Sequence, residues 1–238
     1  MPAQKTAIIT GASGSIGTGL VQGFLNDNYN VVATSLNATQ SSLTSSPNLV
    51  LVDGDLSKQV VAAQVASAAI ERFGSIDVLV NNAGIFRKKH FVDYTTEDVN
   101  ALVSINMFGF IYVTQFAVKQ MLKQKSGNVV TISASLADHP IAGENASISM
   151  MTKGGLNSAT RNLAMEYAKE GIRFNAVAPG AVATAMHADS PGDAQQRSPI
   201  GKLAEVKDIV QAVLYLAKAD QVTGEVLNVD GGAHVGRW

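Results

Sequence analysis

The 238-residue chain contains no cysteine, which excludes disulfide bonds, thiolate catalysis and zinc sites built on cysteine. Positive and negative charges nearly balance, because the formal net charge is -1. The composition therefore does not favour nucleic acid as a partner. We find no signal-type stretch at the N-terminus and no apolar run long enough to span a bilayer. We therefore expect a cytoplasmic protein without a membrane partner or a metal, whose chemistry depends on other side chains.

Short β-branched runs alternate with helical patterns along the whole sequence. This alternation is typical of a parallel sheet with helices on both faces. The expected strands are continuous apolar runs, so both of their faces should be buried. We predict an α/β fold, a Rossmann-like doubly wound seven-stranded parallel sheet, in a single domain that covers residues 1–238. The expected strands are residues 7–10, 30–35, 48–54, 77–82, 127–133, 172–178 and 225–231.

Residues 95–127 predict one long helix of about 28 residues, because a capping threonine and acidic residues begin it and lysines and Gly127 end it. Its middle carries more apolar residues than one stripe can hold. A helix of this kind buries a second face, either under its own loops or in a partner subunit. We expect a homo-oligomer, a dimer or tetramer.

A glycine-rich stretch, TGASGSIGTGL at residues 10–20, lies where the first strand turns into the first helix. Such a turn lets the backbone approach a pyrophosphate, and the helix N-terminus offers free N–H groups and the positive end of its dipole. A glycine-rich turn can also be simply a tight connection. Its position inside a βαβ unit is what favours a dinucleotide site.

Further motifs follow in a characteristic order, and the chain resembles the short-chain dehydrogenase/reductases over essentially its whole length. The family usually has a glycine where this chain has Ser15. The motifs that carry the resemblance are TGASGSIG (10–17), NNAG (81–84), Asn106, Lys153 in KGGL, NAVAPGAVATAM (175–186) and VDGG (229–232).

The resemblance implies a nicotinamide dinucleotide cofactor and the residues that would hold it. The acid that would select NAD at the end of the second strand is replaced by Ser35, which slightly favours NADP(H) over NAD(H), although no arginine or lysine is obviously placed to attract a phosphate. The expected cofactor-binding residues are Gly11, Ser13, Ser15, Ile16, Gly17, Ser35, Asp55, Leu56, Asn82, Ala83, Gly84, Lys153, Pro179, Gly180, Val182 and Thr184.

The family's acid, a tyrosine four residues before the lysine, is absent. Ser149 occupies its position, while Lys153 and Asn106 are retained. A serine is several ångströms shorter, and its hydroxyl lacks the phenol pKa near 10 that an ammonium can lower. In the family a serine after the fifth strand polarises the substrate oxygen. Here Ala134 aligns most simply with it, and of the flanking Ser133 and Ser135 we favour Ser135.

Another group could replace the missing acid. His139 lies in the loop that approaches the nicotinamide in this fold, although a loop histidine is more often just solvated. His187 belongs to a segment that resembles a substrate lid, and His90 is expected in a solvated turn.

Two functions from different classes follow. The first is an NAD(P)-dependent oxidoreductase acting on a small carbonyl or alcohol, or on an imine or activated alkene, with the proton handled by a Lys153-ordered water, Ser135 or His139. The second is a nucleotide-binding module without turnover, in which Lys153 only grips the ribose. The apparently complete substrate-side segments favour the enzyme, but the fold alone does not decide.

Overall fold

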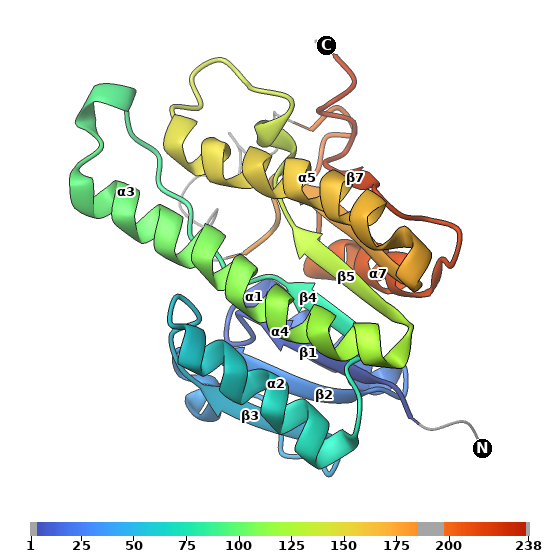
Figure 1. Cartoon of the computed structure of the whole chain (residues 1–238). Helices are drawn as coiled ribbons and strands as arrows, with labels where there is room; N and C mark the ends of the chain where they lie inside the picture. Colours follow the sequence, from blue (N-terminus) through green and yellow to red (C-terminus); the bar gives the residue numbers. More distant parts are fainter. Residues whose placement is uncertain (1–3, 185–197, 237–238) are drawn as a thin grey trace.

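The computed structural model describes residues 4–184 and 198–236 and contains one parallel sheet of seven strands (Figure 1). The strand order is β3-β2-β1-β4-β5-β6-β7. The strands β2 and β3 are added on one side of β1 and the later strands on its other side, so the order of addition reverses between β1 and β4 while all strands stay parallel. This confirms the predicted doubly wound arrangement. The strands are β1 Thr6–Thr10, β2 Asn30–Ser35, β3 Leu49–Asp53, β4 Val78–Asn81, β5 Gly127–Ile132, β6 Ile172–Pro179 and β7 Val226–Val229.

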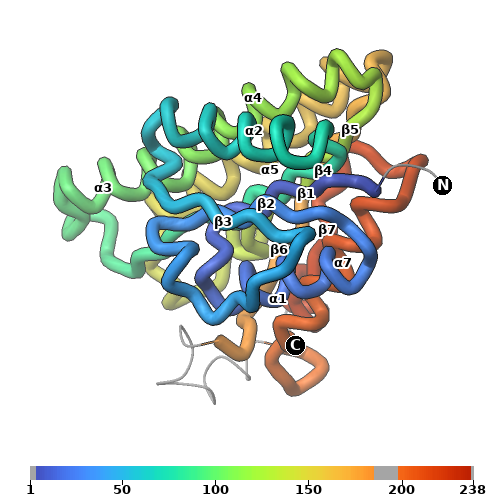
Figure 2. Tube along the Cα trace, turned by 90° about the horizontal axis from the view of Figure 1, so that it is seen from below, coloured from blue at the N-terminus to red at the C-terminus, as the bar shows by residue number. Residues whose placement is uncertain are grey.

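Helices cover both faces of the sheet. Figure 2 shows the sheet edge-on, with α2, α4 and α5 on one side and α1 and α7 on the other. Each side has its own apolar core. The helices are α1 Ser15–Asn26, α2 Gln59–Phe73, α3 Thr96–Val103, α4 Gly109–Gln124, α5 Ser147–Tyr167 and α7 Val206–Lys218, with short helical turns at Ala38–Gln40, Phe91–Asp93, Ser135–Ala137 and Ala168–Glu170.

Burial differs between the central and the edge strands. Strands β1, β2, β4, β5 and β6 are buried along almost their whole length, as continuous apolar strands should be. The edge strands β3 and β7 are only half-buried, so the prediction of complete burial is wrong for these two. An edge strand has a paired neighbour on one side only, and its helical cover is less complete.

The predicted long helix runs from Thr96 to Gln124, 29 residues, but it is not uniform. Thr95 caps it by accepting a hydrogen bond from Asp98 N, while the Asp98 side chain accepts one from Thr95 N. A π-helical segment, Ser104–Phe108, separates α3 from α4. Such widened turns occur often at functional sites, and this one contains Asn106.

This helix is also long and apolar enough to cross a membrane by length and composition alone. The expectation that no such run exists was therefore too strict. A core helix passes the same test, and α4 packs against α2 and strands β4, β5 and β6. Part of its surface stays open, including the stacked pair Phe108 and Tyr112, and the homo-oligomer remains a prediction.

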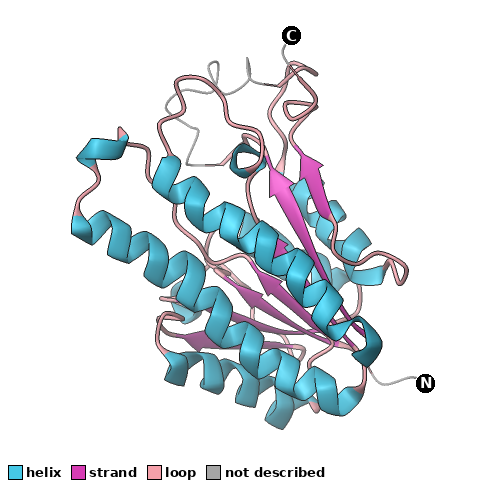
Figure 3. Cartoon of the chain, turned by 45° about the horizontal axis from the view of Figure 1, so that its top comes forward, coloured by secondary structure: helices cyan, strands magenta, loops and turns pink. Residues whose placement is uncertain are grey.

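All seven strands point the same way, so their carboxyl ends meet at one edge of the sheet (Figure 3). In open α/β sheets, ligands bind outside this edge, where the strand order reverses. The reversal between β1 and β4 therefore predicts the position of the site.

Candidate active site

The glycine-rich turn after β1 is tightly packed. Gly11 has a φ of +65°, a left-handed conformation that favours glycine. A Cβ on Gly17 would lie 2.1 Å from the Gly11 carbonyl oxygen, so no larger residue fits there without movement. Helix α1 begins at Ser15, and the first N–H groups of a helix have no acceptor within it. The turn therefore presents free donors and a positive dipole end to an anion.

Hydrogen bonds tie this turn to the end of β4. The Thr10 hydroxyl accepts bonds from the backbone N–H groups of Asn82 and Ala83, both at 2.9 Å. The Asn82 side-chain amide donates to the carbonyls of Thr10 at 2.9 Å and Gly11 at 3.2 Å. Asn82 thus fixes the backbone between the carboxyl ends of β1 and β4, where the strand order reverses. This backbone forms the floor of the site.

One cavity of about 930 Å³ opens above this floor. All sixteen residues predicted to bind the cofactor line it, from Gly11 at one end to Thr184 at the other. Of the predicted catalytic residues, Ser135, Ser149 and Lys153 line it as well. The structure thus brings together residues that are far apart in sequence.

The end of the cavity at β2 carries an unsatisfied polar group. The Ser35 hydroxyl is buried and has no hydrogen-bond partner among the described residues. A sugar hydroxyl or a phosphate would satisfy it, so the site fits the ribose of a dinucleotide. Lys58, which the sequence did not single out, lines the same cavity. Its only signal in the sequence is its place two residues after Leu56.

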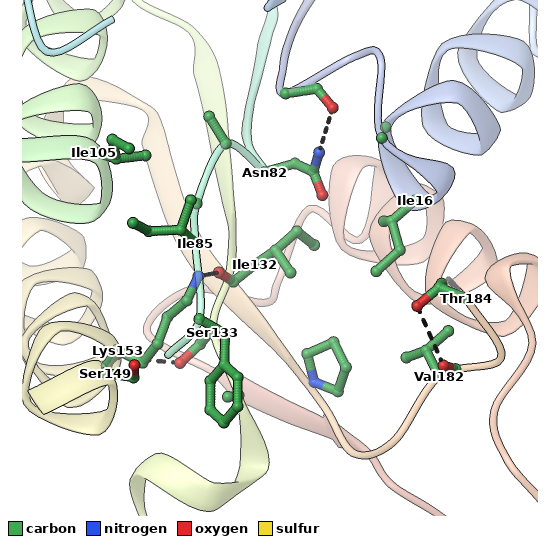
Figure 4. Close-up of a pocket in the computed structure, with 18 of the residues that line it drawn as sticks. Ile16, Asn82, Ile85, Ile105, Ile132, Ser133, Ser149, Lys153, Val182 and Thr184 are labelled. Atoms are coloured by element: carbon green, nitrogen blue, oxygen red, sulfur yellow. Dashed lines mark hydrogen bonds between the residues drawn. The ribbon is translucent and has the colours of Figure 1, made fainter. Parts of the chain in front are cut away.

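Lys153 lines the cavity. Its ammonium donates a 2.7 Å hydrogen bond to the Ile132 carbonyl at the end of β5 (Figure 4). Burial of the ammonium, which penalises the charged form, lowers the pKa of Lys153 to about 8. The side chain is therefore fixed in place and close to titration at neutral pH.

Asn106 joins the neighbouring segments but does not line the cavity. Its Nδ2 donates to the Ile85 carbonyl at 3.0 Å and to the Thr152 hydroxyl at 2.9 Å. Its Oδ1 accepts from Ile85 N at 2.8 Å. Asn106 is 1% exposed, so its observed contacts are structural ones that hold the Gly84–Ile85 backbone against α5.

Comparison with known proteins agrees with this geometry. A family model described as enoyl-(acyl carrier protein) reductase matches residues 11–234. A 3-oxoacyl-[acyl-carrier-protein] reductase from Thermotoga maritima is 32% identical over 245 residues, which cover 96% of this chain and 97% of that protein. The chain belongs to the short-chain dehydrogenase/reductase family. It is therefore a member of a family of oxidoreductases that use nicotinamide cofactors.

Two further comparisons cover almost the whole chain. Carbonyl reductase family member 4 from Xenopus laevis is 32% identical to this short-chain dehydrogenase/reductase, over 96% of the chain and 97% of that protein. The structure of ElxO with NADP bound has a TM-score of 0.91 and 27% identity, covering 98% of this chain and 100% of that one. The likeness thus extends over the whole chain.

Ser149, expected from the sequence at the family's tyrosine position, uses its hydroxyl on the backbone. The hydroxyl donates to the Arg87 carbonyl at 2.9 Å and accepts from Arg87 N at 3.0 Å. The residue is 1% exposed. Ser149 therefore acts as a clamp, and its only proton is committed to Arg87.

The clamped segment, residues 85–90, is held from several sides. Asp98 forms ion pairs with Arg87 and Lys89, and Lys89 N donates to the Asn145 carbonyl at 2.7 Å. Hydrogen bonds from Lys89, Thr95 N and Arg87 hold the pKa of Asp98 well below its usual range. Segment 85–90 is thus fixed, and its first two residues, Ile85 and Phe86, line the cavity.

The two serines after β5 differ in their surroundings. Ser133 donates to the Lys153 carbonyl at 3.3 Å, which links β5 to α5. The Ser135 hydroxyl has no hydrogen bond among the described residues, although Ser135 lines the cavity. Ser135 is therefore the better placed of the two to meet a substrate oxygen, and its catalytic role stays a prediction.

None of the described histidines lines the cavity. His139 is exposed and absent from the lining of the cavity, and its ring lies 5.5 Å from that of His234. The expected approach of its loop to the nicotinamide therefore does not bring the imidazole into the site. His90 is exposed, as expected, while His187 lies outside the described residues. His234 and Asp230 form a pair at 2.8 Å that was not predicted. The contact closes a turn of five residues after β7, and nothing in the sequence indicates it.

Proposed function

We propose that this protein is an NAD(P)-dependent oxidoreductase acting on a small carbonyl or alcohol, with imines and activated alkenes as further substrates. The observation that carries the proposal is the position of Lys153, fixed to the Ile132 carbonyl in the cavity that begins at the glycine-rich turn. Relatives named as reductases of 3-oxoacyl groups, carbonyl compounds and diacetyl support the same reaction class.

The cofactor would lie across the carboxyl ends of the strands. The N-terminus of α1 would hold its pyrophosphate, and Ser35 would meet the adenosine ribose. Lys153 would bind the second ribose through N–H groups that Ile132 leaves free. When bound, the nicotinamide supplies or accepts the hydride. The residues of this chain orient it, exclude water and manage the proton.

The other part of the cavity wall would receive the substrate. The lining of this part is mainly apolar. It also contains one carboxylate close in sequence to α5, that of Glu144. Lys88 on the clamped segment pairs with Glu144 at 2.9 Å, so this carboxylate is not an isolated charge. An apolar carbonyl compound fits such a wall better than a highly charged one. The apolar residues of this wall are Ile85, Phe86, Ile105, Leu136, Ile141 and Met150.

Purified protein should consume NADPH or NADH in the presence of ketones, imines or enones. The measurement is cofactor absorbance at saturating cofactor over such a panel, with binding followed separately by cofactor fluorescence. Turnover with one substrate class supports the proposal. Cofactor binding without consumption for any compound contradicts it and favours the nucleotide-binding module.

Ser35→Asp should weaken NADPH binding about tenfold or more and leave NADH binding less affected. A carboxylate there repels a ribose phosphate and accepts hydrogen bonds from an unmodified ribose. The measurement is the Kd of each cofactor by fluorescence titration, with Ser57→Asp as the matched control because Ser57 also lines the cavity. Equal losses for both cofactors, or a loss in the control as large, contradict a role for Ser35 in selecting NADPH.

A further inference from the structure

The cavity contains few groups that exchange protons near neutral pH. Within residues 4–184 and 198–236, no tyrosine or histidine lines it. Serine and threonine hydroxyls are not effective general acids, so an ionisable side chain is required. The ionisable residues of the lining are Asp55, Lys58, Glu144, Lys153, Lys202 and Asp230.

The carboxylates among them act as acceptors. Asp55 accepts a hydrogen bond from Ser57 N at 2.9 Å, and Glu144 is paired with the Lys88 ammonium. Asp230 accepts bonds from Gly232 N at 3.1 Å and from the backbone and ring of His234 at 2.9 and 2.8 Å. A carboxylate held by N–H donors has no proton to give to a substrate.

The three lysines differ in exposure. Lys58 and Lys202 are exposed to solvent, while Lys153 is partly buried and bonded to the end of β5. A Cβ built on Gly84 would lie 3.2 Å from Lys153 Nζ and 3.1 Å from Asn106 Oδ1. The ammonium therefore faces the Gly84 backbone.

Charged groups on the surrounding elements are engaged with one another. On segment 85–90 and α3, Arg87 and Lys89 pair with Asp98. On the loop after β5, Asp138 pairs with Arg161, and His139 lies against His234, which Asp230 holds. Burial is accordingly the cause that lowers the pKa of Lys153, without a neighbouring charge.

We propose that the Lys153 ammonium itself exchanges the proton with the substrate oxygen, directly or through one water, while Ser149 only clamps the cavity wall. This rests on the proposed function. In reduction, an Nζ–H bond breaks and an O–H bond forms on the substrate oxygen, whose carbon receives the hydride with its electron pair. The ammonium becomes a neutral amine, which then takes a proton from solvent.

The sign of the pH dependence follows from this step. Reduction needs the charged lysine, so its rate should fall about tenfold per pH unit above a pKa near 8, and oxidation should gain rate over the same range. Lys153→Arg keeps the charge but cannot release a proton. At saturating cofactor it should lose about 100-fold or more of the reduction rate and the break in the pH profile.

The experiment combines single-turnover reduction across pH with a readout that needs no activity. In cofactor-free protein labelled with ¹⁵N-lysine, one side-chain resonance should titrate near pH 8 and be missing from Lys153→Arg. Lys169→Arg, the same change at an exposed lysine, is the matched control. Ser149→Ala should keep the midpoint of the pH profile.

Each remaining outcome has a defined meaning. A Lys153→Arg rate within about fivefold of wild type, a profile without a break, or a shifted midpoint in Ser149→Ala overturns the proposal. Titration of the Lys153 resonance only above about pH 10 does so too. Failure of the wild type to consume cofactor with any substrate overturns the proposed function instead, and is recognised because cofactor binding and the lysine titration are measured independently.

Discussion

Replacing Ser149 by tyrosine is expected to destabilise the protein without restoring a family-type acid. The Ser149 side chain is 1% exposed and makes two hydrogen bonds to the Arg87 backbone. A phenol would break both, worth about 1 kcal/mol each, and would crowd the contact between α5 and segment 85–90 at a further cost of about 1–3 kcal/mol. We expect the free energy of unfolding to fall by about 3–5 kcal/mol and Tm by about 10 °C.

Denaturant unfolding and calorimetry measure this change, and two controls separate its parts. Ser149→Ala removes the hydrogen bonds without added volume and should cost about 1–3 kcal/mol. Met151→Tyr adds a phenol to the same helix at a residue that is 67% exposed, and should change stability by less than about 0.5 kcal/mol. A Ser149→Tyr protein as stable as wild type, with increased reductase activity, would show that segment 85–90 yields easily and that Ser149 is not a clamp.

The cofactor half of the site could be predicted from sequence because its signals are local. Gly11 and Gly17 must be small for reasons that act within the turn itself, and a turn of this kind follows a strand and begins a helix in the printed sequence. Parallel strands then bring the later motifs to the same edge of the sheet. The fold followed from these short-range patterns, while most of the residues expected to line the cavity were implied by the resemblance to the short-chain dehydrogenase/reductases.

The catalytic half could not be predicted in the same way. The bonds between Ser149 and Arg87 join a side chain to a backbone 62 residues away, and any residue except proline at position 87 offers the same backbone groups. The approach of His139 to His234 likewise depends on two loops whose meeting no periodicity encodes. No proline in the sequence marks the π-helical turn at Asn106. Long-range contacts to backbone atoms thus decide which predicted groups are free for chemistry.

Replacing Gly17 by alanine is expected to remove both stability and cofactor binding. The added Cβ would lie 2.1 Å from the Gly11 carbonyl oxygen and 2.8 Å from Ala12 Cα, both backbone atoms that cannot rotate away. Relief requires α1 to move by about 1 Å relative to the turn, since non-bonded carbon contacts lie near 3.5–4.0 Å. We expect a loss of about 3 kcal/mol in unfolding free energy, within the upper range for overpacking.

The same movement withdraws the N-terminus of α1 from the phosphates. A misplacement of about 1 Å can cost on the order of 100-fold in function, so NADPH affinity in Gly17→Ala should fall by about that factor. Gly14→Ala is the matched control for stability, because its Cβ would meet only the Gly11 oxygen at 3.6 Å and its φ of -78° suits alanine. Chemical unfolding and fluorescence titration of both variants decide the matter. If Gly17→Ala were as stable as Gly14→Ala and bound NADPH like wild type, close packing of the turn would not be what positions the helix N-terminus.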